Sequence, residues 1–147
     1  MSAPCTVIPT GNFQLSDFQG FCLTAVFATN TVVETECILP PQAPPDQTQW
    51  SFVPVNHGHV LLSGISQVTS ETILLDEDAN GKAITGSNTG FGFNISCFPF
   101  NTNLVTLVDN LVGTEITLTS PGIETAQVVF EPFTDSIAQL WNIEALD

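Results

Sequence analysis

Apolar residues in this chain occur in short runs, and Gly, Asn, Pro or Ser bound nearly every run. The runs are rich in Val, Ile, Phe, Thr and Leu, which suit a pleated and half-buried surface. No long segment repeats its apolar positions with the 3.6-residue period of a helix. The pattern therefore predicts an all-β chain of short strands joined by turns.

Twelve candidate strands form three sets of four. The first set is "GNFQLS", "FCLTAV", "VVETEC" and "QWSFVPV"; the second is "GHVLLS", "TILLDE", "KAITGS" and "FGFNISC"; the third is "NLVTLV", "TEITLT", "QVVFEP" and "LWNIEAL". In each set an apolar residue marks the first strand and an aromatic residue marks the last strand. The leading residues are Phe13, Val60 and Val105, and the closing residues are Trp50, Phe93 and Trp141.

Nearly equal spacing of these residues indicates internal repeats. The repeats cover about 11–55, 56–100 and 101–147 of a single domain, 1–147. Three such units are too few for the blades of a propeller. A closed three-fold barrel leaves no exposed sheet edge, so we expect a β-trefoil with the three closing aromatic residues buried at equivalent positions.

Two short motifs add a family resemblance. Gln139 and Trp141 form a Q-x-W motif in repeat three, and "QTQW" from Gln47 to Trp50 is related to it in repeat one. Together with the repeats, these motifs resemble the ricin-B-type β-trefoil lectins over nearly the whole chain, most of all the small fungal lectins of mushroom fruiting bodies. The resemblance implies a non-catalytic protein that binds galactose- or GalNAc-type sugars on glycans or glycoproteins.

The resemblance also suggests where sugar would bind. Sites in that family have an acidic side chain near the second strand of a repeat, an aromatic ring, and an Asn just before the Gln of the motif. These groups suit a sugar because a carboxylate accepts hydrogen bonds from hydroxyl groups and a ring covers the apolar face. In repeat one the acidic position falls on or near Thr24, and Gln47 takes the Asn position with Asp46 beside it. In repeat three these positions fall near Thr117 and on Ala138.

Repeat two has Gly92 before Phe93 where the family has an amide, so no repeat carries the full set. Repeat one is the best candidate because Gln47 keeps an amide beside a carboxylate. Each of these candidate residues is of a type found more often in turns or on surfaces than as a sugar ligand. The candidate sugar-binding residues are Asp17, Thr24, Asp46 and Gln47 in repeat one and Asp76, Asp78 and Asn80 in repeat two.

Charge excludes several partners. The chain has 15 acidic residues against one basic residue, and its formal net charge is -14 at pH 7. Such a charge repels phosphate backbones and anionic lipids, so we expect no nucleic-acid binding and no membrane insertion. The start of the chain lacks the basic and apolar regions of a signal peptide, and we expect a cytoplasmic protein. The sequence leaves open whether the chain forms a homodimer.

The four cysteines are Cys5, Cys22, Cys37 and Cys97, and no two of them form a C-x-x-C pair that would indicate zinc or redox chemistry. In a reducing compartment they are most simply buried thiols. The alternative is a disulfide within repeat one, between Cys22 and Cys37.

"DEDANGK" fits the first half of a calcium loop through Asp76, Asp78 and Asn80. However, Ser87 stands where that loop has its bidentate Glu. The "NG" pair between two strands favours a hairpin turn. His57 and His59 lack a third ligand nearby in the sequence. We therefore expect no metal site and no cofactor.

Enzyme signatures such as G-x-S-x-G, H-E-x-x-H and a phosphate-binding glycine loop are absent, so we expect no catalysis. The alternative function is protease inhibition, because the trefoil also resembles Kunitz-type plant inhibitors and fungal protease inhibitors. Those proteins act through exposed loops on a rigid barrel. Candidate loops are "SDFQGF", "FATNTV" and the proline-rich "LPPQAPPDQ". A trypsin-directed inhibitor is disfavoured, since Lys82 is the only basic residue.

Overall fold

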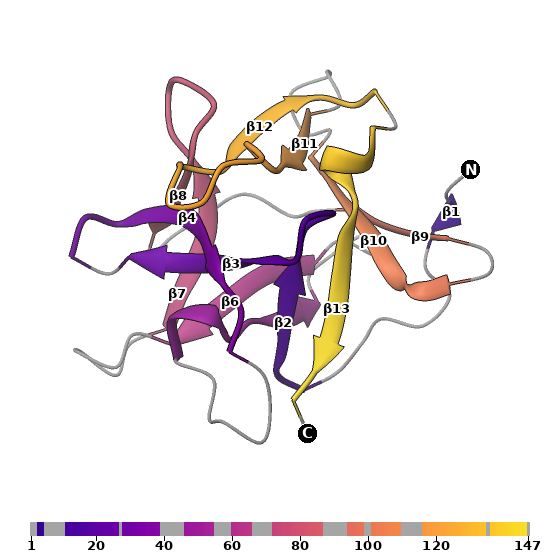
Figure 1. Cartoon of the computed structure of the whole chain (residues 1–147), viewed down its shortest axis with the longest axis horizontal. Helices are drawn as coiled ribbons and strands as arrows, with labels where there is room; N and C mark the ends of the chain where they lie inside the picture. The colour runs from indigo at the N-terminus through magenta and orange to yellow at the C-terminus, as the bar shows by residue number, and fades with distance from the viewer. Residues whose placement is uncertain are drawn as a thin grey trace.

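The structure is β-sheet almost throughout (Figure 1). It is a computed structural model that describes residues 3–4, 11–26, 28–38, 46–54, 60–65, 72–86, 94–98, 101–109, 116–134 and 136–146. Within these ranges there is no helix long and apolar enough to cross a membrane. His57, His59 and Phe93 lie outside the described residues.

All twelve expected strands are present, most of them within two or three residues of the predicted bounds. An additional strand of two residues, β1, pairs with β9. Two 3-10 turns, η1 (Asp46–Thr48) and η3 (Ile137–Gln139), precede β5 and β13. The strands are β1 (Ala3–Pro4), β2 (Phe13–Ser16), β3 (Phe21–Val26), β4 (Thr31–Glu36), β5 (Ser51–Pro54), β6 (Val60–Ile65), β7 (Thr72–Glu77), β8 (Ala83–Gly86), β9 (Asn94–Phe98), β10 (Asn101–Asp109), β11 (Ile116–Thr119), β12 (Val129–Pro132) and β13 (Trp141–Ala145).

The first and last strands of the three sets build a barrel. The last strand of each set pairs antiparallel with the first strand of the next: β5 with β6, β9 with β10, and β13 with β2. The third of these pairings joins the end of the chain to its beginning. Within a set, Phe13 pairs with Trp50, and Val105 pairs with Trp141 in the same way. The residues predicted to lead and close repeats one and three are therefore partners across the sheet.

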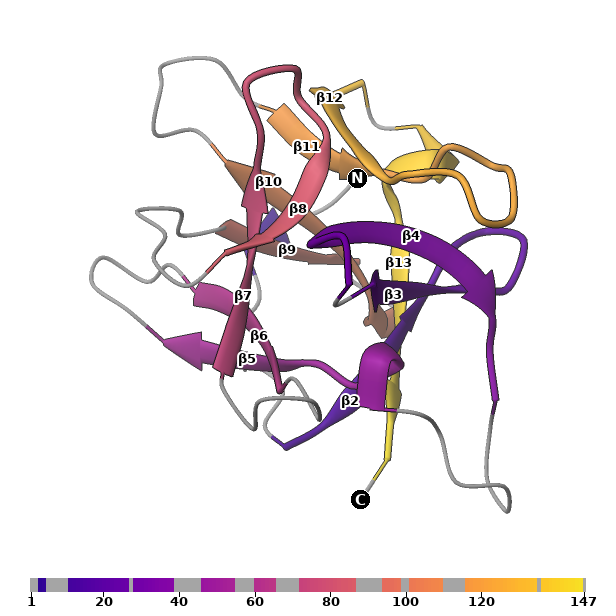
Figure 2. The same cartoon turned by 90° about the vertical axis from the view of Figure 1, so that its left-hand side faces the viewer.

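The middle strands of each set form three antiparallel hairpins, β3–β4, β7–β8 and β11–β12. Figure 2 shows β4, β8 and β12 close together at one end of the molecule. Ala83 N donates to Val128 O at 2.8 Å, and Val128 N donates to Val32 O at 2.9 Å. All three side chains are fully buried. One small apolar residue from each hairpin thus meets at the centre of the cap, which lets the three backbones approach closely.

Two tryptophans repeat one structural role. Trp50 Nε1 donates to Leu23 O at 2.9 Å, and Trp141 Nε1 donates to Leu118 O at 3.0 Å. Both rings are buried, so each indole N–H has the partner that burial demands. The predicted equivalence of these two residues is confirmed. The third member of the set, in repeat two, is not described.

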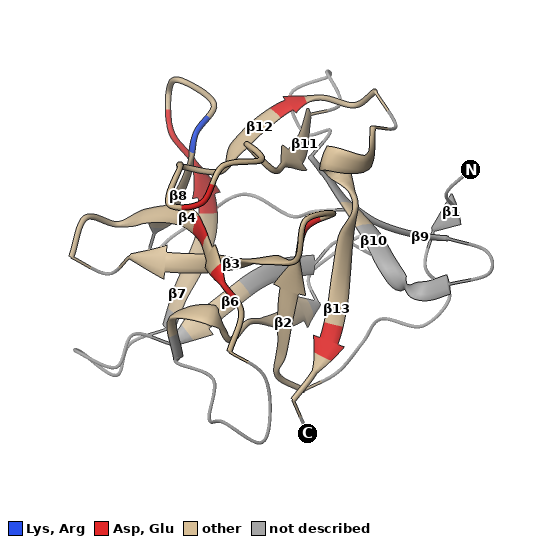
Figure 3. Cartoon of the chain, in the orientation of Figure 1, with Lys and Arg blue, Asp and Glu red and all other residues tan. Residues whose placement is uncertain are grey.

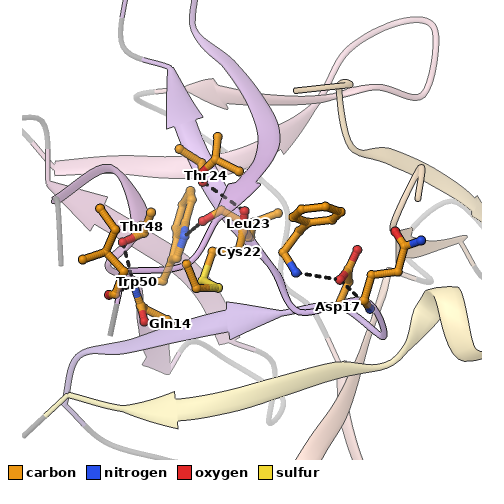
Figure 4. Close-up of a disulfide and its surroundings, with 12 residues drawn as sticks. Gln14, Asp17, Cys22, Leu23, Thr24, Thr48 and Trp50 are labelled. Carbon is orange, nitrogen blue, oxygen red and sulfur yellow. Dashed lines mark hydrogen bonds between the residues drawn. A yellow bond between two sulfur atoms is a disulfide. The ribbon is translucent and has the colours of Figure 1, made fainter. Parts of the chain in front are cut away.

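The expectation of buried thiols is wrong for Cys22 and Cys37, which form a disulfide with 5.1 Å between their Cα atoms (Figure 4). The register of the β3–β4 hairpin explains this, because it places Cys22 opposite Thr35, two residues before Cys37. Disulfides persist in oxidising environments. The expected cytoplasmic location stays a prediction. Cys5 lies outside the described residues.

Acidic residues are distributed over several strands and turns of the described chain (Figure 3). Lys82, the only basic residue of the chain, is exposed and follows Gly81 in the β7–β8 turn. Lys82 is therefore the only lysine or arginine that can pair with an acidic side chain.

Candidate functional site

An open cleft lies beside the β3–β4 hairpin and η1, with a volume of about 680 Å³. Repeat one supplies every lining residue except one, which comes from the segment between β11 and β12. The apolar part of the lining includes Ala25, Val26 and Ile38. The polar lining residues are Thr24, Thr35, Glu36, Gln47, Thr48 and Glu124.

A buried glutamine holds two walls of the cleft together. Gln14 Nε2 donates to Thr48 Oγ1 at 2.9 Å and to the carbonyl oxygen of Ile38 at 3.2 Å (Figure 4). Thr48 belongs to η1, whereas Ile38 follows β4. Gln14 itself lies on the barrel strand β2 and has no exposed surface. The barrel therefore fixes the distance between the two segments that carry the lining residues.

The hydroxyl of Thr24 is already engaged. Its Oγ1 donates to Cys22 O at 3.0 Å and lies 2.8 Å from Thr35 Oγ1. Because a hydroxyl has one proton to donate, Thr35 must be the donor in the second bond. Thr24 is buried, so it orients Thr35 and contributes little surface of its own to a ligand.

Three longer polar side chains are free to meet a ligand. Gln47, Glu36 and Glu124 are all exposed and line the cleft. Beside them Ile38 exposes 38% of its surface. Carboxylates accept hydrogen bonds from hydroxyl groups, and an amide both donates and accepts. The cleft can therefore bind a polyhydroxylated molecule that also has an apolar face.

Of the predicted site residues in repeat one, Thr24 and Gln47 come together at the cleft. Asp46 begins η1 next to Gln47, and its side chain is not described. Asp17 is not at the cleft. It is buried, and its Oδ1 accepts from the backbone N–H of Gln19 at 2.8 Å and of Phe21 at 2.9 Å.

The candidates from repeat two lie in a different place, at the end of β7 and in the β7–β8 turn. Asp78 Oδ1 accepts from the N–H groups of Asn80 at 2.8 Å and Lys82 at 2.9 Å. Asp76 Oδ1 accepts from the N–H of Glu77 at 2.8 Å. Among the described residues, no group of three or more His, Cys, Asp or Glu is arranged to hold a metal ion.

Asp17 and Asp78 begin the same five-residue turn. In each, the carboxylate accepts from the N–H groups two and four residues later, and the fourth residue is a glycine with φ of 91° or 79°. The sequence signal is D-x-x-G-x, present as "DFQGF" and "DANGK". A glycine is needed at the fourth position because other residues rarely adopt a positive φ.

Sequence reasoning missed Thr35, Glu36, Ile38 and Glu124. Alternation in "TVVETE" carried a usable signal for Thr35, since Val32 and Glu34 share the inward face of β4 and Thr35 lies on the opposite face. Glu36 would share the inward face by alternation and is exposed at the last position of the strand. Glu124 carried none, because it belongs to another repeat and reaches the cleft only through the tertiary fold.

Next to the cleft along β4, three buried polar side chains meet. Ser120 Oγ lies 2.7 Å from both Asp17 Oδ2 and Glu34 Oε1, and it accepts from Gly122 N at 3.0 Å. Burial, followed by the hydrogen bond with Asp17, raises the pKa of Glu34 to about 8. Burial acts in the same sense on Asp17, but hydrogen bonds from Glu34, Ser120 and two backbone N–H groups outweigh it and lower the pKa of Asp17.

No protein-family profile and no curated protein matches this sequence. Solved structures do match its fold. ThreeFoil, a designed protein with three-fold symmetry, has a TM-score of 0.69 at 16% identity, over 92% of this chain and 99% of its own. The ricin B-like lectin of Macrolepiota procera, solved with lactose, has a TM-score of 0.65 at 11% identity, over 96% of this chain and 99% of its own. The fold is a β-trefoil.

A mosquitocidal holotoxin contains a similar trefoil. The TM-score is 0.73 at 12% identity, over 97% of this chain but only 18% of the toxin chain. At such identities the matches show the fold alone. They confirm the predicted trefoil of twelve strands in three repeats.

Proposed function

We propose that this trefoil is a non-catalytic lectin that binds one galactose-type sugar in the repeat-one cleft. The observation that carries the proposal is that Glu36, Gln47 and Glu124 are exposed around one cleft that also contains apolar surface. Vicinal hydroxyl groups of a pyranose can donate to the carboxylates, and its apolar face can cover Ile38. The fold that this chain shares with a ricin B-like lectin in complex with lactose supports the choice of sugar.

Charge narrows the sugar class. The cleft has two carboxylates, and the single basic residue of the chain is at the β7–β8 turn. A sialylated or sulfated glycan would bring negative charge toward Glu36 and Glu124, which is unfavourable. We therefore propose neutral glycans with terminal galactose or GalNAc.

A glycan array read beside a panel of serine, cysteine and aspartic proteases tests the proposal. We expect signals on neutral galactosides, weaker signals on their sialylated forms, and no protease inhibition. A blank array together with tight inhibition of a protease would replace the lectin with the alternative class.

Site variants then locate the binding. Glu36→Gln, Glu124→Gln and Gln47→Ala should each weaken lactose binding in calorimetry. Glu131→Gln is the matched control, since Glu131 is exposed on β12 and does not line the cleft. Equal affinities for the site variants and the control would place the sugar elsewhere on the trefoil.

A further inference from the structure

A buried group of three polar side chains links two repeats. This carboxyl cluster consists of Asp17, Glu34 and Ser120. Asp17 lies in the β2–β3 turn and Glu34 on β4, both in repeat one, whereas Ser120 follows β11 in repeat three. All three residues are buried. Its hydrogen bonds therefore hold together parts of the chain that are far apart in sequence.

Counting protons shows that the carboxyl cluster needs one extra hydrogen. Ser120 has one hydroxyl proton and two lone pairs, and one lone pair already accepts from Gly122 N. Its hydroxyl can therefore donate to only one of the two carboxyl oxygens at 2.7 Å. If both carboxyl groups were ionised, the carboxyl oxygen that receives no proton from Ser120 would face a lone pair of the Ser120 hydroxyl oxygen, which is repulsive.

A protonated Glu34 satisfies both contacts of the Ser120 hydroxyl with the carboxyl groups. Glu34 Oε1–H then donates to Ser120 Oγ, and Ser120 donates to Asp17 Oδ2. Glu34 Oε2 is buried and has no hydrogen-bond partner, so an ionised Glu34 would leave charge on an unsolvated oxygen. Asp17 is the better anion, because two backbone N–H groups donate to its other oxygen. The raised pKa of Glu34 agrees with this assignment.

The backbone of Glu34 connects the carboxyl cluster to the cleft. Thr125 N donates to Glu34 O at 2.7 Å, and Glu34 N donates to Ala126 O at 3.3 Å. Thr125 has a φ of 67°, a conformation that a threonine adopts only when its surroundings hold it there. Glu124, which lines the cleft, immediately precedes it. The segment 120–126 is thus fastened to β4 at one end by Ser120 and at the other by these backbone bonds.

Few other ionisable groups face Glu34. The neighbouring strand β3 contains only Cys22, which is in the disulfide. Glu36 on the same strand and Glu124 on segment 120–126 are exposed. Within the described residues, the charge that acts on Glu34 is that of Asp17.

We propose that the carboxyl cluster is a proton-dependent lock: with Glu34 protonated it holds segment 120–126 and Glu124 at the cleft, and loss of the proton releases them and weakens sugar binding. The binding part of this inference rests on the proposed lectin function. The lock itself can be measured without any ligand.

The lock is tested first by NMR on the wild-type chain with ¹³C-labelled carboxyl groups. We expect Glu34 to titrate several pH units above ordinary glutamates, and the amide signals of Gly122 and Thr125 to shift with the same midpoint. Asp17→Asn should lower that midpoint, because it removes the neighbouring negative charge. Titration of Glu34 in the ordinary glutamate range, or amide signals that do not follow it, would overturn the lock.

Lactose is the probe for the coupling to binding. In the wild type, we expect the dissociation constant to rise about fivefold or more across the Glu34 titration. Glu34→Gln should bind with little pH dependence, because an amide cannot lose the proton. Glu131→Gln should behave as the wild type. A Glu34→Gln variant with the wild-type pH profile would refute the coupling. If lactose fails to bind at every pH, the lectin proposal fails for this sugar, and the NMR titration alone decides the lock.

Discussion

Glu34 takes in repeat one the position that Phe130 takes in repeat three. Glu34 pairs with Leu23, and Phe130 pairs with Leu118. The two leucines are equivalent, since the carbonyl of each accepts the indole N–H of the tryptophan that closes its repeat. A carboxyl group therefore lies where repeat three has an aromatic ring. Its burial is unfavourable unless it is neutral and hydrogen-bonded.

Stability should fall as the pH rises through the range in which Glu34 differs between the folded and unfolded states. The pKa of Glu34 is raised from 4.5 to about 8, so between these values the folded chain binds a proton that the unfolded chain has released. The free energy of unfolding then decreases by about 1.4 kcal/mol per pH unit from this group alone. Asp17 has a lowered pKa and acts in the opposite sense, only as the pH falls below its ordinary 3.8.

Urea unfolding across that pH range measures the effect. The difference between wild type and Glu34→Gln isolates it, because the histidines and the other acidic residues contribute equally to both. If the two stability curves run parallel, Glu34 is ionised in the folded protein.

Truncation of either closing tryptophan should be costly. Trp50→Ala and Trp141→Ala should each lower the free energy of unfolding by about 3–5 kcal/mol, through lost burial and the cavity that remains. Trp→Phe at the same positions should cost less but should still leave a buried leucine carbonyl without its donor, at about 1–3 kcal/mol. Chemical denaturation of the four variants provides the comparison. A loss below about 1 kcal/mol for either alanine variant would contradict the core position.

Reduction of the Cys22–Cys37 disulfide should destabilise the hairpin beneath the cleft. The bond closes a sequence separation of 15 residues, and a loop of this size is worth about 3 kcal/mol. The expected midpoint of urea unfolding is therefore lower with reductant than without it. Peptide mapping under non-reducing conditions should recover the two cysteines in one linked fragment. Recovery of both as free thiols from untreated protein would contradict the bond.

The two equivalent aspartate turns should respond unequally to substitution. Asp78→Ala removes two hydrogen bonds at the β7–β8 turn and should cost about 1 kcal/mol. Asp17→Ala removes the matching pair and also the acceptor of Ser120 in a buried site, so we expect about 2–4 kcal/mol. Thermal unfolding of both variants gives the difference.

The β7–β8 segment should not bind calcium. Calorimetry with Ca²⁺ on wild type and Asp76→Ala is the measurement, and binding tighter than about millimolar would show that this segment is a calcium loop.

Local pattern was enough for the strands and the repeats. Alternation and turn residues predicted β3 and β7 at their observed bounds, because successive side chains of a strand point to opposite faces of the sheet. The "QTQW" motif aligned Trp50 with Trp141, but superposition of the two tryptophans places Thr48 where repeat three has Gln139. The buried amide in repeat one comes instead from Gln14, on a different strand. Sequence spacing could not show that exchange, since it is made across the barrel.

The sequence by itself determined the all-β class, the three repeats and the two core tryptophans, since these depend on periodicity and on the apolar character of single positions. Only the tertiary structure decided which polar residues meet. Gln47 and Glu124 reach one cleft from different repeats, and Asp17, Glu34 and Ser120 meet in one buried hydrogen-bonded cluster. Such groupings follow from how three hairpins are packed around one axis. The energy of a buried carboxyl group depends on neighbours that are distant in the chain, so no local pattern encodes it.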